Sequence, residues 1–435
     1  MAYYTDLDER FLEVKDWLDL KKEHGADSDA AAEELRGLLA QFAKKIEKLP
    51  VDKALQEKEP DDLDAIRALR PDGPRVLEMN FSDEELEDRI LGAWLGRAAG
   101  CMLGVPVEGF TREGIESACH ALEVPYPIYD YWERLPRVVE FHNTYNGLPF
   151  TRFLKPYMEY AMPDDDMLYT LVGLVILEEY GLDFTIEDVG KAWLKYVPFG
   201  CTAEKVAIKH LKAGMIPPET ALVNNPDSEY LGADIRSDPW GYAAPGMPEL
   251  AATYAYRDAR VSHIRNGIYG EMFFSAVISA AIATGDINKS IEIGLTEIPA
   301  ECRLAEGIRQ TLDWCSETHD YNKILDKIFD RYRGMHCGHT INNAALVVAG
   351  LICGHEDFST IITSVVMAGM DTDCTGATAG SIAGAIWGAK KLPKRWIEPM
   401  GSIHRSYMPD RWIWDNNDIA RRFTKLALAN RDRTV

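Results

Sequence analysis

The sequence has little positive charge and no long apolar run. Its 47 Lys and Arg residues are outnumbered by 69 Asp and Glu residues, which leaves a net charge of −22. A chain this acidic repels phosphate backbones and anionic bilayers, so we expect no nucleic-acid partner and no membrane partner. Uncharged stretches fall short of the ~20 apolar residues that a membrane-spanning helix needs. The run from Cys374 to Ala389, for example, is interrupted by three hydroxyl residues.

Cysteine is also scarce. The eight cysteines form no Cys-x-x-Cys pair, and a chain of 435 residues does not depend on disulfides. We therefore expect reduced thiols, most of them small core residues. The first ten residues, MAYYTDLDER, lack the basic start and apolar core of a secretory signal. These absences predict a cytoplasmic protein, and a hydrophobic content of 46% is typical of a folded globular one.

Residues 1–80 differ in composition from the rest of the chain. They are rich in charged residues, Leu and Ala, and they contain few glycines. Between Ala30 and Leu49 the apolar residues recur at helical spacing; they are Leu35, Leu38, Leu39, Phe42, Ile46 and Leu49. Prolines at positions 60, 71 and 74 then indicate an extended linker. We predict a helical arm and linker over residues 1–80 and a catalytic domain over residues 81–435.

The catalytic domain carries helical patterns almost throughout. Ser82 and Glu85 have the spacing of a capping box, which predicts a helix start. Further helices are expected near 168–180, 185–195, 202–213, 267–284, 287–292, 302–318, 321–332, 340–353, 358–368 and 376–389. Strict polar–apolar alternation is scarce. The pattern predicts an all-α fold, a compact multi-helix domain whose functional residues lie in loops between helices.

Two of these helices carry glycine at every fourth position. One stripe comprises Gly92, Gly96, Gly100 and Gly104, and the other Gly376, Gly380, Gly384 and Gly388. Each glycine lowers helix stability by roughly 1 kcal/mol relative to alanine. Close approach of neighbouring helices would offset that loss, so we expect both stripes to be packing surfaces.

Two acidic clusters precede helices. Asp164, Asp165 and Asp166 follow Met162-Pro163, and Asp371 and Asp373 precede the second glycine stripe. Capping of a helix N-terminus explains one aspartate in each cluster, and for the triplet alone it is the stronger explanation. Capping does not explain several carboxylates beside a buried helix, because an unpaired buried carboxylate is unfavourable. Asp carboxylates are hard oxygen ligands, so the clusters predict a shared site for divalent cations.

A third acidic residue, Glu108, follows the first glycine stripe in the segment GCMLGVPVE. A carboxylate in a glycine-rich turn is often only a solvated side chain. Beside a metal, however, Glu108 would orient the attacking water or act as its general base.

These three segments, in this order, resemble the ADP-ribosylglycohydrolase family. The family motifs are G-x-x-x-G-x-A-x-G-D-x-L-G-x-P-x-E, T-D-D before a helix, and D-x-D-[TS]-x-G-A-x-A-G. Here they read GAWLGRAAGCMLGVPVE (92–108), DDD (164–166) and DTDCTGATAG (371–380). The resemblance spans about residues 85–390. It implies an all-α fold and a two-metal centre, usually Mg²⁺, that hydrolyses the bond at an ADP-ribose anomeric carbon.

The resemblance assigns roles to individual positions. Metal ligands are expected at Asp164, Asp165, Asp166, Asp371, Asp373 and Cys374, and catalytic roles at Glu108, Asp165 and Asp373. Three positions depart from the motifs: Asp164 replaces Thr, Cys374 replaces Thr or Ser, and Cys101 replaces Asp. A soft sulfur at residue 374 either is no ligand or favours Mn²⁺ over Mg²⁺.

The middle of the chain lacks the family's G-N-G-x-x-M-R stretch. Another segment stands in its place. Four candidate substrate-binding residues lie in or near that segment: Asn143 in a polar turn before it, Trp240 and Tyr242 within it, and His263 after it. The aromatic rings could stack on a sugar or base, although most aromatics are core residues. A lone histidine is likewise more often structural than catalytic.

The sequence therefore predicts a metal-dependent glycosyl hydrolase that uses two divalent cations, Mg²⁺ first and Mn²⁺ or Ca²⁺ as alternatives. Its expected substrate is an N- or O-linked ADP-ribosyl group or a related sugar conjugate. One alternative is a glycosidase for a small free glycoside or nucleoside. Another, from a different class, is a catalytically silent protein that binds ADP-ribose, or binds a partner through its N-terminal arm. The motifs predict no oligomeric state.

Overall fold

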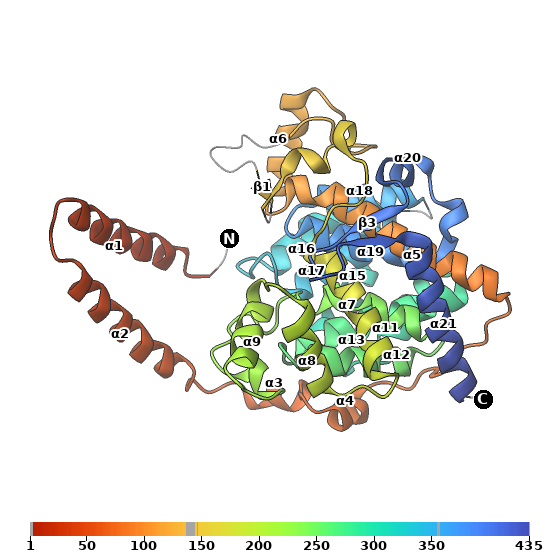
Figure 1. Cartoon of the computed structure of the whole chain (residues 1–435), viewed down its shortest axis with the longest axis horizontal. Helices are drawn as coiled ribbons and strands as arrows, with labels where there is room; N and C mark the ends of the chain where they lie inside the picture. The colour runs from red at the N-terminus through yellow and green to blue at the C-terminus, as the bar shows by residue number, and fades with distance from the viewer. Residues whose placement is uncertain (1–2, 136–143, 146, 355–356, 435) are drawn as a thin grey trace. The chain divides into compact units, whose positions relative to one another are not determined.

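The computed structural model describes residues 3–135, 144–145, 147–354 and 357–434. Helices dominate these residues, and the strands are limited to two short hairpins (Figure 1). The predicted all-α fold is confirmed. The helices are α1 (Thr5–Glu23), α2 (Asp29–Ile46), α3 (Lys53–Lys58), α4 (Leu63–Leu69), α5 (Asp83–Gly104), α6 (Arg112–Leu122), α7 (Asp165–Tyr180), α8 (Ile186–Tyr196), α9 (Thr202–Lys212), α10 (Glu219–Leu222), α11 (Asp238–Ala243), α12 (Pro248–Ala259), α13 (Asn266–Thr284), α14 (Ile287–Gly294), α15 (Arg303–Glu317), α16 (Tyr321–Arg331), α17 (Thr340–Cys353), α18 (Phe358–Met367), α19 (Thr372–Trp387), α20 (Lys394–Ile397) and α21 (Asn416–Thr434).

The chain divides into two compact units. Unit 1 comprises residues 1–58 with 332–336, and unit 2 comprises residues 59–331 with 337–435. Unit 1 holds α1 and α2, two long helices that run antiparallel and are joined by a short turn (Figure 1). None of the α2 side chains is buried.

The division between the units falls at residue 58, whereas the sequence prediction places it at residue 80. Residues 59–80 belong to unit 2 because their charged side chains pair with its helices. Glu59 accepts from Arg303 over 2.8 Å, and Arg70 and Arg75 both donate to the buried carboxylate of Glu297 over 2.6 and 2.7 Å. The prolines that predict a linker therefore shape a segment that lies along the helical core.

The two glycine-striped helices, α5 and α19, pack against each other at the centre of unit 2 (Figure 1). The stripes interlock so closely that no side chain fits between the backbones. A Cβ added at Gly100 would lie 1.9 Å from the carbonyl oxygen of Gly376, and one at Gly384 would lie 2.0 Å from that of Gly92. The predicted close approach is therefore a contact between the two stripes themselves.

Other helices enclose this central pair. The apolar helix α13 packs against α12, α14, α11 and α19, and α17 packs against α15, α18 and α19. Residues 83–107 and 266–284 are long and apolar enough to cross a membrane, but 94% and 89% of their apolar windows are buried inside the protein. Burial of this kind is typical of core helices.

The two hairpins are antiparallel. β1 (Thr144–Tyr145) pairs with β2 (Leu148–Pro149), and β3 (Ile403–Arg405) pairs with β4 (Ile413–Asp415), with His404 opposite Trp414. His404 points into the core, where the centre of its ring lies 5.0 Å from that of Trp94 and the two rings are nearly perpendicular.

Candidate metal centre

Acidic side chains from three distant segments meet at one place in unit 2. The segments are the turn after α5, which carries Glu108, and the starts of α7 and α19. Ligand-type atoms lie within 4.8 Å of one another in three overlapping groups. The groups are Asp164 with Asp165 and Asp166; Asp166 with Asp373 and Cys374; and Glu108 with Asp371 and Asp373. Asp373 thus belongs to the group at α7 and to the group at Glu108.

The chain brings Glu108 to the late acidic motif by pairing two loop segments. The amide of Gly109 donates to the carbonyl of Met370 over 2.9 Å, and the amide of Met370 donates to that of Phe110 over 3.0 Å. Gly369, with φ +82°, lies so close to the segment after Glu108 that a Cβ would be 2.6 Å from the Phe110 carbonyl. Only glycine fits there.

Both explanations for the aspartate triplet apply, each to a different residue. The Asp164 side chain caps α7 by accepting from the amide of Asp166 over 2.9 Å. Asp165 and Asp166 are the first two residues of α7 and are not needed as caps. At α19 the residue in the cap position is Asp371, and its side chain makes no capping hydrogen bond. Its Oδ1 atom is buried and accepts no hydrogen bond from the described residues.

A buried arginine supports the α7 side of the centre. Arg97, on α5, is fully buried and donates to the Asp166 backbone carbonyl over 2.7 and 2.9 Å and to its Oδ1 atom over 3.1 Å. The same guanidinium donates to Asp238 over 2.6 Å and to the Ile235 carbonyl over 2.6 Å. The other carboxylate oxygen of Asp166 accepts from the thiol of Cys374 over 3.0 Å.

Burial and crowding of like charges disfavour the ionised form of these carboxyl groups. Burial, followed by the charge of Asp373, raises the pKa of Asp165 to about 6. Burial also raises the pKa of Asp166, against the opposing effect of Arg97, and burial and Asp373 raise that of Asp371. The Cys374 thiol has its pKa raised by burial and then by Asp166. A site of this kind gains stability when a cation neutralises it.

Two of the predicted substrate-binding residues lie in the core. Trp240 is 1% exposed; its indole donates to Glu271 over 2.7 Å, and its ring stacks on Phe184 at 5.1 Å. Tyr242 is fully buried and donates to Asp238 over 2.8 Å. Protein encloses both rings, so the expected stacking on a sugar does not fit this arrangement. Tyr242 instead extends the chain of contacts from Asp166 through Arg97 and Asp238.

His263 is also fully buried. Its Nδ1 lies 2.7 Å from the Ser262 hydroxyl, and its Nε2, which has no hydrogen-bond partner among the described residues, lies 3.9 Å from Glu204. Burial first, and then the charge of Arg236, lowers the pKa of the imidazole well below its ordinary value. The structure therefore places His263 in a buried network with Ser262 and Glu204, outside the three groups of the acidic cluster. The remaining candidate, Asn143, lies outside the described residues.

Sequence reasoning missed Arg97 and Asp238 as residues of this site. The available signal was a single arginine inside the apolar, glycine-striped segment LGRAAG. An arginine flanked on both sides by packing glycines is destined for burial, and a buried guanidinium needs carboxylate partners.

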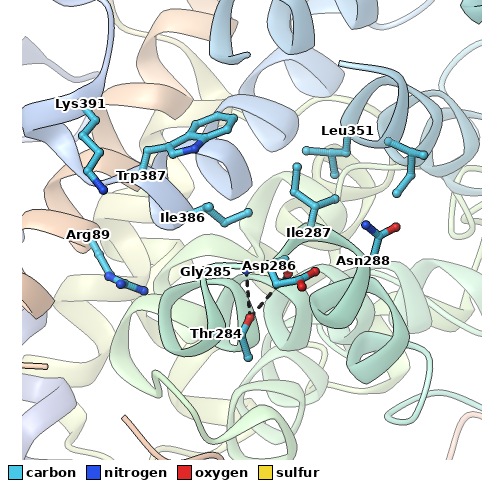
Figure 2. A pocket seen from close by; sticks show the side chains of 11 residues that line it. Arg89, Thr284, Gly285, Asp286, Ile287, Asn288, Leu351, Ile386, Trp387 and Lys391 are labelled. Atoms are coloured by element: carbon cyan, nitrogen blue, oxygen red, sulfur yellow. Dashed lines mark hydrogen bonds between the residues drawn. The ribbon is translucent and has the colours of Figure 1, made fainter. Parts of the chain in front are cut away.

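A large hollow of about 650 Å³ lies at the other end of α19 and contains none of the predicted site residues. Figure 2 shows Lys391, Arg89 and Trp387 on one side of it and Asp286 and Asn288 on the other. The acidic cluster is at the first turn of α19 and the hollow at its last, about 20 Å apart at 1.5 Å per residue. The hollow is therefore separate from the acidic cluster.

Comparison with known proteins agrees with this geometry. The family model described as ADP-ribosylglycohydrolase matches residues 82–432. A solved structure titled "ADP-ribosylglycohydrolase-related protein complex" has a similar fold, with a TM-score of 0.53 and 19% identity, over 79% of this chain and 99% of that one. No curated protein sequence matches. The match spans both acidic motifs and the Glu108 segment, so the chain belongs to the ADP-ribosylglycohydrolase family.

Proposed function

We propose that this protein is a metal-dependent hydrolase that cleaves the glycosidic bond of an N- or O-linked ADP-ribosyl group or a related sugar conjugate. Membership of the family suggests a glycohydrolase. The observation that carries the proposal is the convergence of Asp373 with Asp166 and with Glu108. These residues come from distant parts of the sequence, and helix capping alone does not require them to meet.

The residues of the cluster fit two divalent cations. Carboxylates from Asp164, Asp165 and Asp166 would hold them from the α7 side, and Asp371 and Asp373 from the α19 side. The buried Oδ1 of Asp371, without a hydrogen-bond donor among the described residues, is the type of atom that a cation satisfies. An oxygen-rich site favours Mg²⁺, with Mn²⁺ or Ca²⁺ as alternatives, and Cys374 adds a softer atom at its edge. The ions, when bound, would polarise the substrate's hydroxyl groups and acidify a water.

Proton transfer belongs to the protein's own carboxylates. Glu108 is only partly buried and lies beside Asp371 and Asp373, so it can reach a water at the mouth of the cluster. We assign it the role of general base that deprotonates the attacking water. Asp165 is the second candidate, since it is a carboxylate of the same acidic cluster. Cleavage would pass through an oxocarbenium-like state, as in other glycoside hydrolysis.

Arg97 acts on this chemistry indirectly. It touches Asp166 and Asp238, so it fixes the orientation of a carboxylate that would bind metal. Arg97 is therefore a positioning residue.

The test compares Asp373→Asn with a matched control, Asp313→Asn, which changes an exposed aspartate on α15. Titration calorimetry with Mg²⁺ and Mn²⁺ measures metal binding, and a panel of ADP-ribosyl-arginine, ADP-ribosyl-serine and simple glycosides measures turnover. We expect the Asp373 variant to lose metal binding and turnover while the control keeps both.

Unchanged turnover in Asp373→Asn would refute the metal assignment. Turnover of simple glycosides alone would favour the small-glycoside alternative. A protein that binds ADP-ribose but neither metal nor hydrolysable substrate would be the silent binder. Cytoplasmic location stays a prediction from the sequence.

A further inference from the structure

The two helices of unit 1 carry the apolar spacing of a coiled coil. In α1, Leu7, Phe11, Val14 and Leu18 are separated by four, three and four residues. In α2 the same alternation of three and four runs through a longer set, namely Ala32, Leu35, Leu39, Phe42 and Ile46. Apolar residues at alternating spacings of three and four form the seam along which helices pair in coiled coils and four-helix bundles.

Both seams are largely open to solvent. Phe11 is 51% exposed, Phe42 is 59% exposed and Ile46 is 54% exposed. Most of the large apolar side chains that are exposed in the described chain fall between Tyr3 and Val51. Monomeric proteins do not usually collect apolar side chains in one exposed region, so this pattern marks an interaction surface.

Helices of this kind need a partner to be stable. Isolated helices shorter than about 15 residues are marginal in water, and longer ones in proteins owe most of their stability to packing of an apolar face. The α2 helix buries no side chain, and it carries the longer of the two seams. Its stability therefore depends on a surface that one copy of unit 1 does not supply.

We propose that this hairpin pairs with the same hairpin of a second copy of the chain, with the two α2 helices antiparallel, to form a four-helix dimerisation element. The charge distribution of α2 favours this partner. On one flank of the α2 seam, Glu34 lies in the first half of the helix and Lys45 in its last turn. Antiparallel pairing of two copies places Glu34 of each α2 helix near Lys45 of the other.

Glu34 and Lys45 are available for such pairing, because neither makes an ion pair among the described residues. Asp29 and Glu33, by contrast, already pair with Lys22 over 2.7 Å and with Arg36 over 2.8 Å. Complementary halves on one helix make that helix its own electrostatic partner, which favours a homodimer over an unrelated acidic or basic protein. This inference goes beyond the hydrolase function and does not depend on it.

Sedimentation velocity on the full chain tests the proposal. We expect a species of twice the 48.8 kDa chain mass. Leu39→Glu places a charge in the seam and should give the monomer. Leu222→Glu is the matched control, because Leu222 is an exposed leucine in unit 2, and it should leave the dimer intact. Thermal unfolding of unit 2, followed in each variant, separates loss of pairing from loss of folding.

Charge reversal tests the antiparallel arrangement. Lys45→Glu should weaken the dimer by about fivefold, since it then lies near Glu34 of the other α2 helix in both symmetry-related contacts. Adding Glu34→Lys to the same chain should restore the affinity. A monomeric wild-type chain, a dimer that survives Leu39→Glu, or a dimer strengthened by the lysine reversal alone would each overturn the proposal.

Discussion

The thiol of Cys374 donates to Oδ2 of Asp166 over 3.0 Å, although the two residues are 208 positions apart in the chain. Their contact joins the first turn of α19 to the first turn of α7. Asp166 also accepts from Arg97, so one carboxylate connects both acidic loops to the central α5 helix.

Replacing Cys374 should change the preference among metals. Cys374→Ser places a hard oxygen where the soft sulfur lies, and hard oxygens favour Mg²⁺. We expect Mg²⁺ affinity in Cys374→Ser to exceed that of Cys374→Ala by about tenfold, the scale typical of residues around metal ligands. Competition between Mg²⁺ and Mn²⁺ in titration calorimetry measures this. Equal Mg²⁺ affinity in the two variants would place residue 374 outside the coordination sphere.

Removing the buried guanidinium of Arg97 should destabilise unit 2. Arg97→Met leaves Asp166 and Asp238 buried without their guanidinium partner, which typically lowers the free energy of unfolding by about 3–5 kcal/mol. Arg97→Lys should rescue little of this, because an ammonium cannot reproduce the fork that serves both residues. Adding Asp238→Asn to Arg97→Met should recover part of the loss.

Urea unfolding of the four proteins provides the measurement for Arg97. If Arg97→Met were as stable as the wild type, the ion pairs of Arg97 would be of no consequence for the fold. A readout specific to positioning is metal affinity, which Arg97→Met should lower even under conditions where the variant is fully folded.

The contact between the glycine stripes of α5 and α19 should not tolerate a methyl group. Gly100→Ala places Cβ 1.9 Å from the backbone of Gly376, so α5 and α19 would have to separate. Overpacking of this kind costs about 1–3 kcal/mol, and more where backbone has to move. The control is Gly37→Ala in α2, which meets nothing within 4 Å. There, alanine should raise helix stability by up to about 1 kcal/mol.

Thermal unfolding of unit 2 distinguishes the two glycine variants. We expect a lower midpoint for Gly100→Ala and an unchanged one for Gly37→Ala. A Gly100 variant with the wild-type midpoint would contradict the direct backbone contact.

His404 should make stability dependent on pH in the acidic range. Its ring is fully buried and its nitrogens have no hydrogen-bond partner among the described residues, and burial lowers the pKa from 6.5 to about 3. The unfolded chain takes up the proton first as pH falls. The stability that the neutral ring contributes is therefore complete above about pH 6.5 and is lost toward pH 3, by up to about 1.4 kcal/mol per pH unit.

His404→Leu removes this proton linkage. Urea unfolding of wild type and variant at pH 7, 6, 5 and 4 should show that the variant loses less stability on acidification. Replacing the exposed His24 by Gln provides the control and should leave the wild-type slope unchanged. If stability fell equally with pH in His404→Leu and wild type, His404 would take up its proton as readily in the folded protein as in the unfolded chain.

The sequence allowed much of the fold to be predicted because its signals are local. Helical spacing and Ser82 as a cap predict α5 correctly, and the hydroxyl of Ser82 does accept from the amide of Glu85 over 3.3 Å. The acidic motifs could be singled out because carboxylates next to an apolar helix are unfavourable without a partner. That the two glycine stripes pack against each other is a long-range property, and no pattern in a single sequence encodes it.

The less successful predictions share one physical cause. Trp240, Tyr242 and His263 were selected by chemical type, but burial decides what a side chain can reach. Trp240 donates to Glu271 on α13, and Tyr242 donates to Asp238 one turn earlier on its own helix, α11. The burial of both rings, which removes them from any substrate, depends on the tertiary fold. The contribution of Arg97 was hidden for the same reason, since its partners come from α7 and α11.

The contact between α5 and α19 has a consequence for how substrates of different size could be accommodated. Two backbones in direct contact have no rotamers to adjust, and the contact extends to Gly104 and Thr372, so the fold itself sets the spacing between the Glu108 turn and the Asp371 loop. Adaptation to a new leaving group must then come from segments that do not touch the contact between α5 and α19. The acidic cluster is thereby insulated from sequence changes in those other segments.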